Sequence, residues 1–284
     1  MHKLKVFFEM IKFEHTIFAL PFAYLGAFLA ANGVPPAMKL LWITLAMVGA
    51  RTAAMSLNRL IDRHIDSRNP RTAQRALPAG QLRVNEVYLY TVLSFLLLGF
   101  SAYKLNLLAL WLMPIAVFFL VLYSYTKRFT WACHLVLGIS LGLAPAGAWI
   151  GITGHWALSP VLLGLGVMTW VAGFDVVYAC QDVEFDRKEG LHSIPAVFGL
   201  QRGLEISAFL HTLAPVFFIA VGVVMSMSWI YYVGVGIAII LLFRQHRLVS
   251  ADDFSKIGVA FFDLNGYLSI LLFVFSILDL ILLH

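Results

Sequence analysis

The 284-residue sequence has few charged residues and almost no cysteine. Charged side chains make up 12% of the chain, compared with about 25% in soluble domains. The two cysteines, Cys133 and Cys180, stand in no Cys/His pattern typical of a metal site. No hydrophilic domain, low-complexity tract or Pro/Gly/Ser-rich linker divides the chain. These absences exclude a soluble, disulfide-rich protein and favour a single domain over residues 1–284.

Apolar residues dominate instead. They make up 61% of the chain, and a segment of about 20 apolar residues spans a bilayer as a helix. Nine segments qualify: 14–32, 38–58, 86–104, 106–124, 133–153, 159–180, 203–226, 228–243 and 259–282. No segment shows the alternating pattern of a transmembrane barrel strand, so the backbone groups must bond within helices. The predicted fold class is therefore an all-α integral membrane protein of nine transmembrane helices.

The basic residues gather in alternate connections between these segments. If the N-terminus is cytoplasmic, only Lys39 and Lys104 lie in connections on the far side, and Arg51 lies inside a span. This bias follows the positive-inside rule. It predicts a multi-pass protein of the inner (cytoplasmic) membrane, with the N-terminus and the long polar loops in the cytoplasm. The same bias accounts for the net charge of +5, so nucleic acid is not an indicated partner.

Two acidic clusters end predicted spans on this cytoplasmic side. They consist of Asn58, Asp62 and Asp66, and of Asp175, Asp182 and Asp186. On a helix, residues four apart share a face and residues seven apart nearly do, so each cluster would present several oxygens to one cavity. Ionisable groups at a membrane edge are costly and usually functional. Mg²⁺, which binds carboxylates together with substrate phosphates, is the cofactor that this pattern predicts.

Cationic side chains follow each acidic cluster. They are Arg68, Arg71 and Arg75 after the first, Lys127 and Arg128 after the fourth span, and Arg187, Lys188 and His192 after the second cluster. An arginine fork matches the geometry of phosphate oxygens. Any one of these residues alone could simply cap a helix or set the topology. The set as a whole favours an enzyme whose substrate has a diphosphate head and a long apolar tail.

Several polar residues of the spans allow two interpretations. Arg51 either pairs internally or belongs to a substrate pocket. The residues Asp263, Asn265 and Asp279 either line the cavity or bond between helices. Histidines 134, 155, 211 and 246 lack the spacing of metal ligands and are interpreted as interfacial or packing residues.

Two of the motifs are familiar. Residues 58–80, NRLIDRHIDSRNPRTAQRALPAG, resemble the first aspartate-rich motif of the UbiA superfamily of intramembrane prenyltransferases, of the NxxxDxxxD type. Residues 175–192, DVVYACQDVEFDRKEGLH, resemble the second, of the DxxYAxxDxxxD type. Residues 123–127 resemble the YxxxK segment of that family. The resemblance extends over essentially the whole chain.

The resemblance implies nine helices around a central cavity that opens laterally to the bilayer. It assigns two Mg²⁺ ions, bound to the substrate diphosphate, to Asn58, Asp62, Asp66, Asp182 and Asp186. Arg71, Arg75, Lys127 and Arg128 would bind the diphosphate oxygens. Asp175 and Tyr178 would lie beside the reacting carbon, with Asp175 or Asp182 as the base, and Lys12 or Arg51 would hold an acceptor carboxylate.

Among the branches of the family, the chain looks most like 4-hydroxybenzoate polyprenyltransferases. This implies transfer of a polyprenyl group from polyprenyl diphosphate to a small aromatic acid in respiratory quinone biosynthesis, with diphosphate released. The chain departs from that group at residues 12–16, KFEHT, and at His192, where a lysine is usual. A dihydroxynaphthoate acceptor, as in menaquinone synthesis, therefore stays open.

Two other classes compete with this interpretation. A CDP-alcohol phosphotransferase would carry a single D-x2-D-G-x2-A-R run, which this sequence lacks. A cation-coupled carrier would place charges near the middle of the membrane rather than at its edge. No protein partner is indicated.

Overall fold

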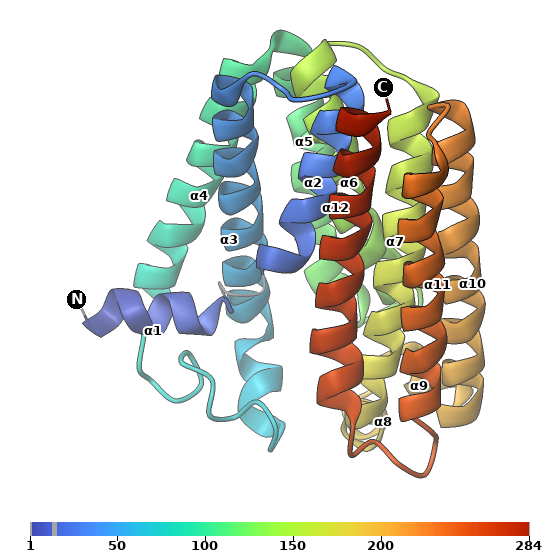
Figure 1. The fold of residues 1–284 in the computed structure, drawn as a ribbon. Helices are drawn as coiled ribbons and strands as arrows, with labels where there is room; N and C mark the ends of the chain where they lie inside the picture. Colours follow the sequence, from blue (N-terminus) through green and yellow to red (C-terminus); the bar gives the residue numbers. More distant parts are fainter. Residues whose placement is uncertain (1, 13–15, 284) are drawn as a thin grey trace.

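The computed structural model describes residues 2–12 and 16–283, and the described residues form helices joined by turns and loops (Figure 1). Eight of these helical segments are long and apolar enough to cross a membrane. They are α3 (Ala37–Arg68), α4 (Val84–Leu105), α5 (Leu107–Thr126), α6 (Cys133–Thr153), α7 with its extension (Leu158–Lys188), α10 (Leu200–Val224), α11 (Trp229–Leu248) and the segment Val259–Leu282. The apolar helix α2 (Thr16–Ala31) is shorter. The prediction of an all-α membrane bundle is confirmed.

The predicted span boundaries agree with the helices where an apolar run ends sharply. They differ where the helix continues into a polar stretch. The predicted segment 133–153 coincides with α6. In contrast, α3 continues beyond the predicted residue 58 to Arg68. The next residue, Asn69, caps the helix, and its extended backbone is the one favoured before a proline such as Pro70. The first acidic cluster consequently lies on a continuous helix.

A short helix, α1 (His2–Met10), precedes the bundle and was not predicted. Figure 1 shows it lying across the bundle beside α3 and α4. Its apolar face, including Phe7 and Met10, packs on Leu60 and Leu82, and Lys3 forms an ion pair with Glu86. The predicted first span begins at residue 14, and residues 13–15 lie outside the described part of the chain.

Helix α7 forms the centre of the bundle. Trp170 of α7 packs on Phe22 of α2 and belongs to the largest apolar cluster, together with Phe218 of α10. Its Nε1–H donates a hydrogen bond of 2.8 Å to Asn265 of α12 (Leu264–Leu282). Asp279 of α12 accepts the backbone N–H groups of Ser228 and Tyr231, at the start of α11. Asn265 and Asp279 therefore bond between helices, whereas Asp263 is exposed.

The chain is irregular after α7, which is where the second acidic cluster lies. Helix α7 itself ends at Ala179. It is followed by a 3-10 turn, η2 (Cys180–Asp182), the short helices α8 (Val183–Lys188) and α9 (Ile194–Phe198), and then α10. Asp175, Asp182 and Asp186 thus lie on three successive elements, and the predicted single helical face is wrong for this cluster. The π-helical turn η3 (Val259–Asp263) similarly precedes α12.

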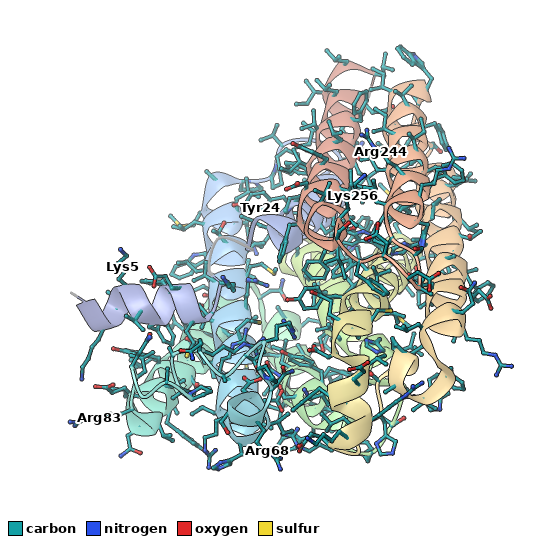
Figure 2. All side chains as sticks on the ribbon, turned by 90° about the horizontal axis from the view of Figure 1, so that it is seen from below. Lys5, Tyr24, Arg68, Arg83, Arg244 and Lys256 are labelled. Atoms are coloured by element: carbon teal, nitrogen blue, oxygen red, sulfur yellow. The ribbon has the colours of Figure 1, made fainter. Side chains whose placement is uncertain are left out.

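We call the lower end of the bundle in Figure 1, formed by residues 60–83, 127–132 and 180–199, the polar end. Figure 2 views the molecule from below, with Arg68 and Arg83 labelled near this end. It contains Asp62 and Asp66 of the first cluster, Asp182 and Asp186 of the second, and the basic residues that follow them. The connections 32–36 and 153–157 lie at the opposite end.

Close helix packing at Gly26 supplies a test of the fold. A Cβ atom at Gly26 of α2 would overlap the backbone carbonyl of Pro145 in α6. We expect Gly26→Ala to lower the free energy of unfolding by about 1–3 kcal/mol, the usual cost of overpacking. Gly236→Ala, where a Cβ meets no atom within 4 Å, is the matched control. Thermal unfolding in detergent checks both, and equal midpoints for the two variants would contradict the packing.

Candidate active site

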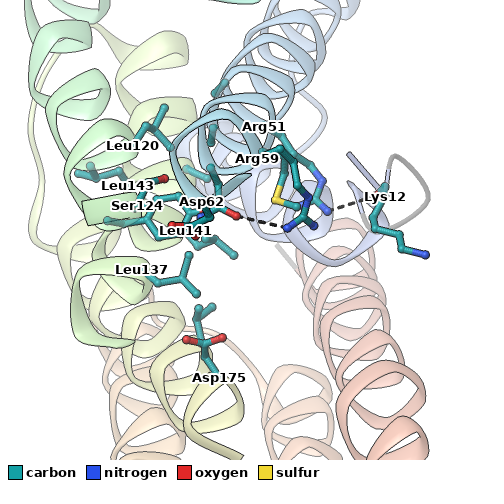
Figure 3. Close-up of a pocket in the computed structure, with 18 of the residues that line it drawn as sticks. Lys12, Arg51, Arg59, Asp62, Leu120, Ser124, Leu137, Leu141, Leu143 and Asp175 are labelled. Carbon is teal, nitrogen blue, oxygen red and sulfur yellow. Dashed lines mark hydrogen bonds between the residues drawn. The ribbon is translucent and has the colours of Figure 1, made fainter. Parts of the chain in front are cut away.

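A cavity of about 900 Å³ extends from the polar end deep into the bundle. Figure 3 shows Asp62 and Asp175 among Leu137 and Leu141, which line it. The cavity brings together most of the site residues that the sequence predicts: Lys12, Arg51, Asn58, Asp62, Asp66, Arg71, Arg75, Lys127, Asp175, Tyr178, Asp182 and Asp186. Both acidic clusters therefore face one compartment.

The carboxylates of the first cluster are buried and bound to cations. Asp62 accepts hydrogen bonds from Arg128 Nη2 at 2.7 Å and from Asn58 Nδ2 at 3.0 Å, and Lys127 Nζ lies 3.6 Å away. Both oxygens of Asp66 lie 2.8 Å from Nη1 of Arg75. The desolvated charges of α3 are thus compensated by bases from the following loop and from the end of α5.

The second cluster is held by the loop that follows the first. Arg71 donates two hydrogen bonds to Asp182, of 2.9 Å and 2.5 Å, and a third of 2.9 Å to the Tyr178 hydroxyl. Asn69 Nδ2 adds a bond of 3.1 Å to Asp182. Burial lowers the pKa of Arg71, but its hydrogen bonds and charge interaction with Asp182 outweigh burial and leave the pKa raised. Arg71 therefore stays charged while it connects the two clusters.

The remaining two acids of the second cluster have other partners. The Ser193 hydroxyl donates to Asp186 Oδ2 at 2.6 Å. Asp175 Oδ2 lies 2.7 Å from Nδ1 of His134, a histidine of α6 that is 3% exposed. The interpretation of His134 as a packing residue is therefore wrong. Sequence spacing could not reveal this pair, because 41 residues separate its members.

Three predicted substrate ligands do not point into the cavity. Arg128 does not line the cavity. It instead donates hydrogen bonds to the Ser124 carbonyl, the Ile61 carbonyl and the Asp62 carboxylate. His192 is exposed and outside the lining. Lys12 reaches the lining, but Figure 3 shows its amine pointing away, while its carbonyl accepts a 3.3 Å bond from Arg51.

Arg59 is a cavity residue that the sequence analysis missed as a site residue. It lies on α3 next to Asn58, is 8% exposed and lines the cavity. Its Nη1 lies 3.4 Å from Asn58 Oδ1 and its Nε 3.4 Å from the Met10 carbonyl. The predicted span ends at residue 58, just before Arg59, whereas α3 runs ten residues further and carries Arg59 on the helix.

The donor atoms of the cavity suit a hard divalent cation. Its polar end is lined by the amide and carboxylate oxygens of Asn58, Asp62, Asp66, Asp182 and Asp186. Within residues 2–12 and 16–283, however, no three His, Cys, Asp or Glu side chains form a ready-made metal cluster. The carboxylates that line the cavity nevertheless fit Mg²⁺, because this ion typically takes one or two protein carboxylates and completes its shell with phosphate oxygens and water.

Away from this end, the cavity wall is apolar. An aromatic wall is formed by Phe174, Tyr178 and Phe261, whose ring centroids lie 4.3 Å (Tyr178–Phe261) and 5.2 Å (Phe174–Phe261) apart. The lining then continues along α5 and α6 to Ala109 and Ile150. Because α5 has 20 residues, the part of the cavity that runs along this helix is about 30 Å long. The cavity suits a long amphiphile with an anionic head.

Comparison with known proteins gives a consistent picture. The sequence matches the UbiA prenyltransferase family over residues 19–273. The 4-hydroxybenzoate octaprenyltransferase of Edwardsiella ictaluri is 30% identical over 260 residues, which cover 90% of this chain and 89% of that protein. The apo structure of a UbiA homologue from Aeropyrum pernix K1 has a TM-score of 0.86 and 32% identity, covering 94% of this chain and 98% of that one.

A further similar structure is a UbiA homologue from Archaeoglobus fulgidus bound to GPP and Mg²⁺. It has a TM-score of 0.77 and 20% identity, and covers 97% of this chain and 99% of that one. At this identity the likeness shows the shared fold.

The connection that Arg71 makes between the clusters can be tested directly. In Arg71→Leu, we expect faster backbone hydrogen exchange in residues 69–83, because the loop loses its bonds to Asp182 and Tyr178. Arg68→Leu is the control, since Arg68 forms a more exposed ion pair with Glu189, a type that contributes about 0–1 kcal/mol. Exchange mass spectrometry measures both, and equal protection in Arg71→Leu and the wild type would contradict the connection.

Proposed function

Because this chain belongs to the UbiA prenyltransferase family and is a membrane-embedded polyprenyltransferase, we propose that its acceptor is a small aromatic acid of the 4-hydroxybenzoate type. A polyprenyl group leaves polyprenyl diphosphate and joins the acceptor ring, as a step of respiratory quinone synthesis. The observation that carries the proposal is the single cavity, acidic and basic at one end and apolar along the rest. The name of the Edwardsiella ictaluri relative supports this class of acceptor.

Magnesium fits the polar end of the cavity. Asn58, Asp62, Asp66, Asp182 and Asp186 would hold it together with the diphosphate. When bound, Mg²⁺ supplies compensation for the negative charge that develops on the leaving group. The UbiA homologue from Archaeoglobus fulgidus bound to GPP and Mg²⁺ supports this cofactor.

Three cations of the chain would bind the diphosphate. Arg71, Arg75 and Lys127 line the cavity, and each lies within 4 Å of a carboxylate. Diphosphate oxygens compete for these donors, so substrate binding exchanges protein carboxylates for phosphate oxygens. The cations then stabilise the negative charge that grows as the bond to the allylic carbon breaks. Arg128 contributes indirectly, because it orients Asp62.

The apolar part of the cavity would accommodate the prenyl tail and protect the cation formed at its allylic end. A wall with few water-binding groups keeps this electrophile from hydrolysis. The faces of Tyr178 and Phe261 favour a positive charge next to them. The electron pair of the breaking carbon–oxygen bond leaves with the diphosphate.

The acceptor would bind in the cavity next to the aromatic wall of Phe174, Tyr178 and Phe261. Arg51 of α3 lines the cavity and would bind its carboxylate. Asp175 is better placed than Asp182 to take the ring proton, because Arg71 occupies both oxygens of Asp182. The ring carbon beside the hydroxyl group forms the new bond to the allylic carbon.

A dihydroxynaphthoate is the alternative acceptor, and the same chemistry would apply to it. The replacement at His192 does not discriminate between the two acids, because its side chain lies outside the cavity. The other departure, at residues 12–16, includes residues 13–15, which the structure does not describe. Turnover of both acids in one assay separates the two acceptors. We further infer from the basic loops that the polar end faces the cytoplasm, at the inner membrane.

The carboxylates provide the test of the proposal. With Mg²⁺, a polyprenyl diphosphate and either aromatic acid, we expect the purified protein to form a C-prenylated product and release diphosphate. Asp62→Ala and Asp182→Ala should each lower turnover by at least about 10²–10³-fold, since each alters the charge that surrounds the diphosphate. Chelation of Mg²⁺ should abolish it.

Asp252→Ala is the matched control, because Asp252 is exposed and is not among the residues that line the cavity. Wild-type turnover in both cavity variants would overturn the assignment. A protein that binds polyprenyl diphosphate without releasing diphosphate would instead support a carrier.

The length of the cavity predicts how tail length affects turnover. Gly147 of α6 lines the cavity, and a Cβ placed there meets no atom within 4 Å. It lies about 20 Å along α6 from His134. We expect Gly147→Leu to lower turnover of octaprenyl diphosphate by about 10-fold, the effect of a misplaced reacting carbon, and to leave geranyl diphosphate unchanged. Gly236→Leu, on α11 away from the cavity lining, is the control. Equal turnover of both tails in Gly147→Leu would contradict this placement.

A further inference from the structure

The hydrogen bonds of His134 determine which of its nitrogens carries a proton. The backbone N–H of Ile194 donates to His134 Nε2 at 3.2 Å, so Nε2 presents its lone pair. The other nitrogen, Nδ1, lies 2.7 Å from Asp175 Oδ2. A neutral imidazole has one N–H, so Nδ1 donates its proton to Asp175. Both nitrogens are thereby used, and the ring is held in one orientation.

This arrangement leaves Asp175 suited to accept a proton. Its Oδ2 receives the Nδ1–H bond, which fixes the orientation of the carboxylate. Its Oδ1 has no hydrogen-bond partner among the described residues, and Asp175 lines the cavity next to the aromatic wall. Figure 3 shows the carboxylate beside Leu137, within the lining. One oxygen is thus held by His134 while the other is available to a ligand.

The Nε2 side of the imidazole is hydrogen-bonded to residue 194 of the loop 191–194. The same loop forms hydrogen bonds with other residues of the polar end. Ser193 donates to Asp186 Oδ2 at 2.6 Å. The N–H of His192 donates to the Lys127 carbonyl at 2.7 Å. Ile194, the next residue, donates to His134. The loop therefore contacts the diphosphate side of the cavity through Asp186 and Lys127, and the acceptor side through His134.

We propose that His134 is a positioning residue that holds the Asp175 carboxylate toward the aromatic acceptor and couples this orientation to the loop 191–194. The inference rests on the proposed prenyl transfer. In that step the ring electrons form the new carbon–carbon bond, the carbon–oxygen electron pair leaves with the diphosphate, and the ring proton passes to Asp175 Oδ1. His134 takes no proton in this step, because its Nε2 accepts the Ile194 N–H.

Two substitutions of His134 separate its hydrogen bonds from its bulk. Glutamine can donate to Asp175 through its amide N–H and accept from Ile194 through its amide oxygen. Leucine fills similar space but can do neither. We expect His134→Leu to lower kcat by about 10–100-fold, as for other residues that orient a functional ligand. The KM for polyprenyl diphosphate should be unchanged, and His134→Gln should restore most of kcat.

A double-mutant cycle distinguishes positioning of Asp175 from a general effect on folding. If His134 acts through Asp175, His134→Leu should have little further effect on kcat in an Asp175→Asn background. A purely structural role would lower kcat by the same factor in both backgrounds. His246→Gln, which changes a histidine away from the cavity and keeps a donor toward His211, is the control for histidine replacement.

The outcomes can be told apart from those that test the function itself. Wild-type kcat in His134→Leu, equal losses in His134→Gln and His134→Leu, or additive effects in the cycle would each overturn the positioning role while leaving prenyl transfer intact. Failure of the wild-type protein to prenylate either acid would overturn the proposed function and this inference together. Hydrogen exchange at residues 191–198 checks the loop, and we expect it to be faster in His134→Leu than in His134→Gln.

Discussion

Each carboxylate that enters this cavity has to be compensated, because a charge removed from water without a partner is strongly destabilising. The structure supplies each of the five acids with a partner from another segment. Arginines pair with three of them, namely Arg128 with Asp62, Arg75 with Asp66 and Arg71 with Asp182. The other two form hydrogen bonds, Asp186 with Ser193 and Asp175 with His134. These contacts fix the loops 69–83 and 191–194 to the neighbouring helices at the polar end. Arg71 and Arg75, which pair with Asp182 and Asp66, also line the cavity, so an incoming diphosphate would meet the same charges that stabilise the fold.

The two acidic clusters differ in structure, although their sequences look alike. The first lies on one continuous helix, α3, and its acids are bound by bases close to them in sequence or at the end of α5. The second is spread over α7, η2 and α8 and is held by the loop after the first cluster. A break in the helix lets Asp175 face the apolar part of the cavity while Asp182 and Asp186 face the polar end.

The sequence predicts the parts of this structure that depend on local composition. Long apolar runs identify the spanning helices, and four-residue spacing identifies the acidic face of α3, because both follow from helix periodicity. Helix α1 escapes this reasoning, since its lysines and phenylalanines are mixed and its partner surface is formed by α3 and α4. The roles of Arg128, Arg59 and His134 depend on contacts between distant segments. Pattern alone assigns such residues to the wrong neighbours.

The distribution of charge also argues against a carrier. A carrier that moves a cation across the bilayer needs polar groups near the middle of the membrane as well as at its edge. Here the carboxylates gather at one end, and the lining beyond them, from Leu137 to Ile150, is largely apolar. A cation that left the polar end would lose its ligands with nothing to replace them. An amphiphile avoids this cost, because its anionic head stays among the arginines while its tail takes the apolar length.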